Sequence, residues 1–186
     1  MDITLEPYLL TVDDYHTMGR AGILTEDDRV ELIEGQIITM SPIGSRHAAC
    51  VKRLNQLLTQ RVQGRALVGV QDPIHLGTYS EPEPDVALLR PRDDFYAEAH
   101  PGPDDVLLLI EVADTTVETD RRIKAPLYAR SGIAEFWLVL LEDDFVEVYR
   151  RPAERGYKEM HRMERGDALP LPTLEGATLS VDEVLG

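Results

Sequence analysis

The chain has 186 residues, 43% of them hydrophobic and 28% charged, which is ordinary usage for a globular protein and argues against intrinsic disorder. Its 34 acidic and 19 basic residues give a formal charge of −15, so a broad basic surface for binding a phosphate backbone is not expected. No stretch approaches the ~20 apolar residues of a membrane span, and the single cysteine, Cys50, excludes an internal disulfide or a cysteine-rich metal knuckle.

The N-terminus and the length set two further expectations. The stretch MDITLEPYLLTVDDY lacks the basic region and long apolar core of a secretory signal, so we expect a cytoplasmic protein that does not associate with membranes. A chain of this size buries roughly 70% of its unfolded surface, and no repeat or Gly/Ser-rich linker suggests a domain boundary. We therefore expect a single domain over residues 1–186.

The first predicted elements are a short helix and a β-hairpin. In TVDDYHTM, Thr11 is followed three residues later by Asp14, which is a variant of the capping box and predicts a helix start. The run DRVELIEGQIITMSP then predicts two strands around Glu34 and Gly35, ending at Pro42.

A long helix is predicted next, over about 45–62. Val51, Leu54 and Leu58 recur there at helical spacing and form one apolar face. His47 precedes Val51 by four residues and so lies on the same face.

The remainder of the chain predicts the strands of a sheet and one more helix of ordinary length. Strands are expected over 66–76, 85–89 and 106–113, the last being apolar on both faces, as is typical of a central strand. A helix over about 120–130 follows. The run AEFWLVLLEDDFVEVYRR predicts a strand, an acidic turn and an alternating strand, and the tail predicts one further strand and a short terminal helix. The fold class is therefore α/β (α+β), with a mixed central sheet flanked by helices.

Two carboxylates interrupt these apolar runs: Asp85 in SEPEPDVALLR and Glu111 in VLLLIEVADTT. An unpaired charge is costly in such places. Because side chains alternate across a strand, Glu111 shares a face with Leu109 and Ala113, whereas Val112 points the other way. If the strand that begins at Asp85 pairs with the strand of Glu111, both carboxylates converge on one edge of the sheet. Carboxylate oxygens are the ligands that Mg²⁺ or Mn²⁺ prefers, and such a cation activates water and stabilises charge on a scissile phosphate.

Each motif also has an ordinary structural interpretation. A lone Pro-Asp is usually a turn, and a lone acid after an apolar strand is often only the exposed end of that strand. The combination and order of the two motifs favour a functional site over either interpretation taken separately.

With both motifs in this order, the sequence resembles the PD-(D/E)XK nuclease superfamily, whose signature is Pro-Asp on one strand and Glu-x-Lys on the next. It resembles more closely the bacterial Uma-two type of restriction-endonuclease-like proteins. The matching stretches, in family order, are RVELIEGQIITMSP, RHAACVKRLNQLL, EPDVALL, LLIEVADTT and DRRIKAPLYARSGIAEFWLV. This resemblance implies a restriction-endonuclease-like fold and a metal-dependent endonuclease that hydrolyses phosphodiester bonds of nucleic acid, with DNA as the expected substrate.

One position departs from the superfamily pattern, because the expected lysine is replaced by Ala113. In the resembling family the lysine comes from the following helix, which implies Lys124. Its long flexible stem could reach the same water from a different backbone position. Lys124 could instead form an ordinary exposed pair with Asp120, worth about 0.3–0.5 kcal/mol. Pro126 complicates the geometry, since inside a helix it removes the amide bond to the carbonyl of Arg122.

The resemblance places two further residues, Glu31 and His47, near the site. Glu31 could extend the metal shell or hold His47, and His47 could hydrogen-bond a ligand carboxylate or contact a phosphate. A strand glutamate is, however, usually solvated, and a histidine on an apolar helical face is usually part of the core. The other four histidines show no spacing that suggests a zinc site: His16, His75, His100 and His161.

Two hypotheses follow. In the first, Asp85, Glu111 and the backbone carbonyl of Val112 hold Mg²⁺ or Mn²⁺, and Lys124 orients or helps to deprotonate the attacking water. The acidic composition opposes it, unless divalent cations offset the acids and basic residues cluster locally, as in KRLNQLLTQRVQGR and RRIK.

In the second, the protein is a catalytically inactive binding or assembly protein that retains the nuclease-like fold, as its acidic surface and Ala113 suggest. A homo-oligomer, expected to be a dimer, is compatible with both hypotheses, because many DNA-cleaving enzymes act as symmetric dimers.

Overall fold

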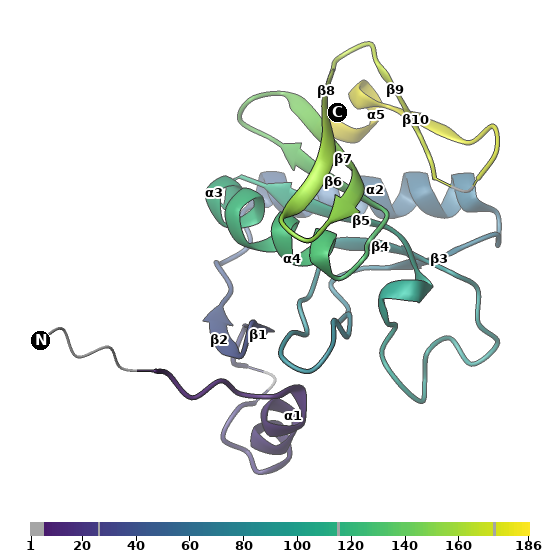
Figure 1. The fold of residues 1–186 in the computed structure, drawn as a ribbon. Helices are drawn as coiled ribbons and strands as arrows, with labels where there is room; N and C mark the ends of the chain where they lie inside the picture. Colours follow the sequence, from purple (N-terminus) through teal and green to yellow (C-terminus); the bar gives the residue numbers. More distant parts are fainter. Residues whose placement is uncertain (1–5, 26, 115, 173) are drawn as a thin grey trace, which may run out of the picture.

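A mixed six-stranded sheet forms the centre of the molecule (Figure 1). The computed structural model describes residues 6–25, 27–114, 116–172 and 174–186. The strands of this sheet, in spatial order, are β3 (Leu67–Gly69), β4 (Val86–Leu89), β5 (Val106–Ala113), β6 (Glu135–Leu140), β7 (Phe145–Ala153) and β8 (Gly156–Glu164). β5 and β6 run parallel, and every other neighbouring pair is antiparallel. The predicted mixed sheet flanked by helices is confirmed.

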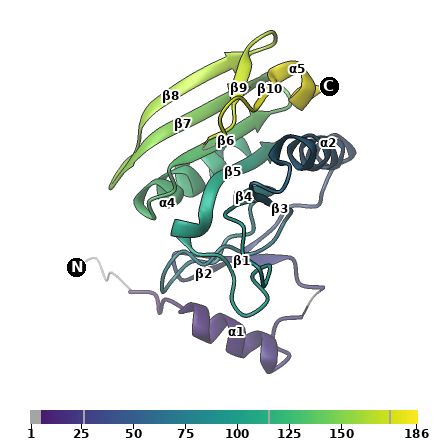
Figure 2. The same cartoon turned by 90° about the vertical axis from the view of Figure 1, so that its right-hand side faces the viewer.

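Helices cover both faces of this sheet (Figure 2). α2 (Ser45–Val62) packs on one face, where its apolar side chains join those of β4 to β7 in one core cluster. The opposite face carries a continuous helical segment made of α3 (Val117–Thr119), a π-helical turn (Asp120–Lys124) and α4 (Ala125–Arg130). None of the helices in the described ranges is both long and apolar enough to span a membrane.

The N-terminal elements lie beside one end of the sheet (Figures 1 and 2). They are α1 (Val12–Arg20) and a hairpin of β1 (Val30–Ile33) and β2 (Gln36–Thr39). A short antiparallel contact between Leu32 and Glu81 ties the hairpin to the chain that leads into β4. The C-terminal part adds a small second sheet, β9 (Ala168–Pro170) with β10 (Thr178–Ser180), and the terminal helix α5 (Val181–Leu185), while a 3₁₀ turn (Pro103–Asp105) precedes β5.

Local sequence signals account for the N-terminal elements. The Thr11 hydroxyl accepts a hydrogen bond from the Asp14 amide at 3.1 Å, and the Asp14 carboxylate accepts one from the Thr11 amide at 3.0 Å, so the predicted capping box is present. The hairpin turns through Glu34 and Gly35 with φ of 50° and 77°. A Cβ on Gly35 would lie 2.6 Å from the Cβ of Leu9, so only glycine fits there.

The long predicted strand over 66–76 is mostly wrong, because only Leu67–Gly69 pairs with β4. Directly after it, the Asp72 carboxylate accepts a hydrogen bond from the Val70 amide at 3.2 Å, and Gln71 takes a left-handed φ of 56°. This local turn competes with strand pairing and leads the chain away from the sheet.

Candidate active site

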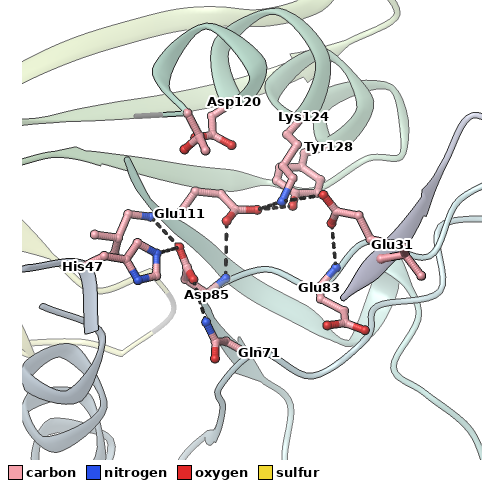
Figure 3. Close-up of polar contacts among 12 residues, drawn as sticks. Glu31, His47, Gln71, Glu83, Asp85, Glu111, Asp120, Lys124 and Tyr128 are labelled. Carbon is pink, nitrogen blue, oxygen red and sulfur yellow. Dashed lines mark hydrogen bonds and ion pairs between the residues drawn. The ribbon is translucent and has the colours of Figure 1, made fainter. Parts of the chain in front are cut away.

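Five predicted residues from five different segments line one cleft of about 270 Å³: Glu31, His47, Asp85, Glu111 and Lys124 (Figure 3). The pairing of β4 with β5 brings the two central carboxylates together. Val86 lies opposite Ile110, and continuing this register by one residue places Asp85 opposite Glu111. Both acids therefore lie where β4 begins, at the edge predicted from the alternation of side chains.

Glu111 is held by donors from the helical layer above it. Its Oε1 accepts hydrogen bonds from Lys124 Nζ at 3.0 Å and from the Tyr128 hydroxyl at 2.6 Å, and its Oε2 lies 3.4 Å from the amide nitrogen of Asp85. The side chain is almost fully buried, and this burial raises the pKa of Glu111, with Lys124 acting in the opposite direction. The carboxylate is thus fixed in one orientation with Oε2 facing Asp85.

The π-helical turn explains how a lysine followed so closely by a proline reaches this carboxylate. The amide of Ala125 donates to the carbonyl of Asp120, five residues earlier, instead of the usual four. Because the widened turn displaces the preceding carbonyls, Pro126 continues into α4 without the helix break expected from its missing amide. Lys124 and Tyr128 are four residues apart, so both side chains reach the same oxygen of Glu111.

Lys124 is buried between two acids. Its Nζ lies 3.0 Å from Oε1 of Glu111 and 3.2 Å from Oε1 of Glu31, and only 7% of the residue is exposed. Burial alone would lower the pKa of Lys124, but the surrounding carboxylates outweigh burial and raise the pKa, so the amine is an ammonium ion. Asp120 instead accepts a hydrogen bond from the Thr116 hydroxyl at 2.7 Å, so the alternative of an exposed lysine–aspartate pair on the helix is wrong.

Asp85 is held from three sides. Its Oδ2 accepts hydrogen bonds from the Val112 amide and from Nε2 of His47, both at 2.9 Å, and its Oδ1 accepts one from Gln71 Nε2 at 3.2 Å. The bond to Asp85 raises the pKa of His47, although partial burial opposes it. Nδ1 of His47 is buried and has no hydrogen-bond partner in the described part of the chain.

Glu31 belongs to the lysine side of the cleft. Besides Lys124, it contacts the backbone of the SEPEPD loop, because its Oε2 accepts a hydrogen bond from the Glu83 amide at 3.1 Å. His47 contacts Asp85 instead of Glu31.

Several residues of the cleft were missed by sequence reasoning. Tyr128 follows Lys124 at the helical spacing of four, a signal that could have suggested it. Gln71 gave no signal, because it lies in a turn that was predicted as strand. Glu83, Asp114 and Asp120 add further carboxylates to the lining.

The donors fit a hard divalent cation. Among the residues that the structure describes, no three His, Cys, Asp or Glu side chains are already grouped for metal binding. Mg²⁺, however, is usually held by only one or two carboxylates, with waters and substrate phosphates as the other ligands. Asp85 and Glu111 lie side by side on the cleft wall with the backbone of Val112, an all-oxygen set of that size.

Comparison with known proteins agrees with this arrangement. Residues 12–182 match the model of the Uma2 family, described as "Putative restriction endonuclease". The chain belongs to the Uma2 family. This membership confirms the resemblance noted from the sequence motifs, and it indicates that this Uma2 protein is a restriction-endonuclease-like nuclease. No curated protein matches the sequence.

Solved structures similar to this Uma2 protein include a "putative nuclease belonging to DUF820" from Anabaena variabilis. It is 20% identical, with a TM-score of 0.72 over 95% of this chain and 97% of that chain, and so shares the fold. The type IIG restriction endonuclease BpuSI matches with 17% identity and a TM-score of 0.43 over 80% of this chain and 17% of that chain.

Proposed function

We propose that this protein is a metal-dependent endonuclease that hydrolyses phosphodiester bonds of DNA, with Mg²⁺ or Mn²⁺ as the cofactor. One observation carries the proposal. The β4–β5 register places Asp85 beside Glu111, and the Lys124 ammonium lies 3.0 Å from Glu111 in the same cleft. Two adjacent carboxylates and an ammonium are the groups that metal-assisted phosphodiester hydrolysis requires.

Asp85, Glu111 and the carbonyl of Val112 would hold the cation. The Val112 amide donates to Asp85, and the amide and carbonyl of one strand residue point to the same side of the strand. The carbonyl of Val112 is therefore directed toward Asp85 as well. Bound here, the cation would lower the pKa of a water molecule and stabilise the charge that develops on the scissile phosphate.

Lys124 acts as a donor in this proposal. Because the neighbouring carboxylates keep it protonated, it can hydrogen-bond the attacking water or a phosphate oxygen but cannot take up a proton. Of the two roles expected from the sequence, orientation of the water is therefore favoured over its deprotonation. Glu31 holds the ammonium from the opposite side, and His47 holds Asp85.

A cleavage assay tests the function. Purified protein is incubated with duplex and single-stranded DNA in Mg²⁺, Mn²⁺ or EDTA, beside the Asp85→Asn and Glu111→Gln variants. Asp143→Asn, in the exposed turn between β6 and β7, is the matched control for loss of one acid. Metal-dependent cleavage by the wild type and the control, and none by the two site variants, is expected. Cleavage that persists unchanged in both site variants would come from a contaminant and would refute the assignment.

The alternative, an inactive binding or assembly protein with this fold, is favoured by one observation. Glu111, Lys124, Glu31 and Tyr128 already satisfy one another in a closed network. Calorimetric titration with Mn²⁺ separates the two functions. The nuclease must bind the ion and lose it in Asp85→Asn, whereas an inactive protein need not bind it at all.

The proposal extends to the organisation of the protein: one domain over residues 1–186, acting as a homodimer. Light scattering at assay concentrations measures the number of subunits, and a monomer that cleaves DNA would remove the dimer from the proposal.

A further inference from the structure

The charge of the cleft creates a problem for a polyanionic substrate. Six acids line it against only two strong bases, Arg29 and Lys124; the acids are Glu31, Glu83, Asp85, Glu111, Asp114 and Asp120. Even with a cation bound, the cleft itself offers little attraction to the phosphates on either side of the scissile bond. Affinity for nucleic acid comes mainly from basic side chains on phosphates, so it has to come from outside the cleft.

A second pocket, of about 320 Å³, has the opposite charge. Three arginines line it, namely Arg46 and Arg53 from α2 and Arg165 from the turn after β8. Of the described residues, its lining includes one acid, Asp144. Such a concentration of arginine stands out in a chain whose formal charge is −15.

The basic pocket borders the cleft. Nη1 of Arg46 lies 3.8 Å from Oδ1 of Asp114, which lines the cleft, and the next residue is His47, which holds Asp85. A nucleic-acid strand that leaves the cleft past the first turn of α2 would therefore meet Arg46 first.

The spacing and anchoring of the arginines suit a phosphate backbone. Arg46 and Arg53 are seven residues apart on one face of α2, about 10 Å at 1.5 Å per residue, which is close to the axial length of three base pairs. Arg53 is fixed by bonds from Nη1 to the carbonyls of Val184 and Leu185 at 3.0 and 2.8 Å.

Arg46 and Arg165 remain accessible. Their side chains are 60% and 42% exposed, although Arg46 donates to the carbonyl of Leu141 and Arg165 to the Asp144 carboxylate. Each guanidinium has five donor hydrogens, more than these bonds use.

We propose that Arg46, Arg53 and Arg165 form a phosphate-binding track that holds the DNA backbone alongside the cleft. This inference rests on the proposed function, because it assigns the path of that substrate. It also explains how so acidic a protein binds a polyanion: the charge for binding is concentrated in one pocket and separated from the carboxylates that act on the scissile phosphate.

Fluorescence anisotropy with a labelled 20-base-pair duplex, in EDTA so that no cleavage occurs, tests the track between 50 and 200 mM KCl. Arg46, Arg53 and Arg165 are each replaced by Gln, singly and together, which removes charge but keeps donor groups. The matched control is Arg155→Gln. This exposed residue lies in the turn at the far end of the β7–β8 ribbon, about 30 Å along nine-residue strands from Arg165.

Each single variant should weaken binding and reduce the slope of log affinity against log salt by about 0.9, and the triple variant by nearly 3. Each lost contact then removes about 3.5-fold of the affinity change between 50 and 200 mM salt. Wild type that does not bind the duplex at 50 mM KCl, or track variants that bind like Arg155→Gln, would overturn the proposal. Arg165→Gln is decisive if Arg53→Gln unfolds, because Arg165 is at the surface.

The outcome is separable from that of the cleavage assay. A protein that binds DNA through the track but never cleaves it would retain the track and lose the nuclease function. Cleavage together with unaltered binding in the arginine variants would retain the nuclease and eliminate the track.

Discussion

Tyr128 provides a sharp test of the site, because its hydroxyl can be removed with little change in packing. The ring is fully buried and meets Phe136 edge to face at 5.3 Å, contacts that phenylalanine would keep. The hydroxyl lies 2.6 Å from Oε1 of Glu111, within the range of a bond to an ionised carboxylate. Such bonds contribute about 1.5–3 kcal/mol, so we expect Tyr128→Phe to lower the free energy of unfolding by that amount.

The same change should affect metal binding. Without the hydroxyl, Oε1 of Glu111 is held by Lys124 alone among its recorded donors, and the carboxylate can rotate away from Asp85. Loss of a group that orients a ligand typically lowers metal affinity or activity by about 10–100-fold. Calorimetric titration with Mn²⁺ and urea unfolding in EDTA at pH 7 measure the two effects on one protein.

Tyr157→Phe is the matched control. Tyr157 belongs to the same aromatic cluster, but its hydroxyl donates to the neutral carbonyl of Ile133 at 2.9 Å. Its loss should cost about 0.5–1.5 kcal/mol and leave Mn²⁺ affinity unchanged. If Tyr128→Phe matches this control in both stability and metal affinity, the hydroxyl does not orient Glu111 and the reasoning is refuted.

Three further outcomes are expected. Lys124→Met should destabilise the metal-free protein by about 3–5 kcal/mol in urea unfolding at pH 7, since it leaves the buried Glu111 uncompensated, and a loss below 1 kcal/mol would contradict a buried ion pair. Burial raises the pKa of the Cys50 thiol to about 11, so about one thiol in a thousand is ionised at pH 8 and Ellman's reagent should react slowly with folded protein and rapidly in urea; fast reaction of the folded protein would place Cys50 outside the core. Because His47 has a raised pKa beside Asp85, its stabilising contribution is complete below the unfolded pKa of about 6.5 and is lost as the pH rises through the folded pKa. His47→Gln should therefore cost more stability at pH 5.5 than at pH 9 in EDTA, and an equal cost at both values would show that the pair is not ionic.

The elements that the sequence predicted well are those whose apolar pattern has one interpretation. The helical face of Val51, Leu54 and Leu58 gave the bounds of α2, and the doubly apolar run gave those of β5. The pairing of the Asp85 and Glu111 strands was a conditional prediction, and the observed β4–β5 register satisfies its condition.

Other features could not be predicted because tertiary contacts or rare backbone geometry determine them. The π-helical turn depends on one amide bonding five residues back, which no residue pattern specifies. Pro126 therefore suggested a break where the structure has a continuous segment. Gln71 reaches Asp85 only because a left-handed residue ends β3 early, and local hydrogen bonding of Asp72 decides that turn.

The position of the lysine links the site to the packing of the fold. At position 113, on the strand, Ala113 is buried among the hydrocarbon side chains beneath α4, and the ammonium comes instead from the helical layer over the sheet. Lys124 and Tyr128 both bond Glu111, so the relative position of this helical layer and β5 sets the geometry of the carboxylate. Any change that shifts the helical layer along the sheet should thus move two of the three donors that orient Glu111, whereas Asp85 keeps its bonds to α2 and β5. The two carboxylates of the site are consequently held by opposite faces of the sheet, and both layers must be packed for the pair to face one cation.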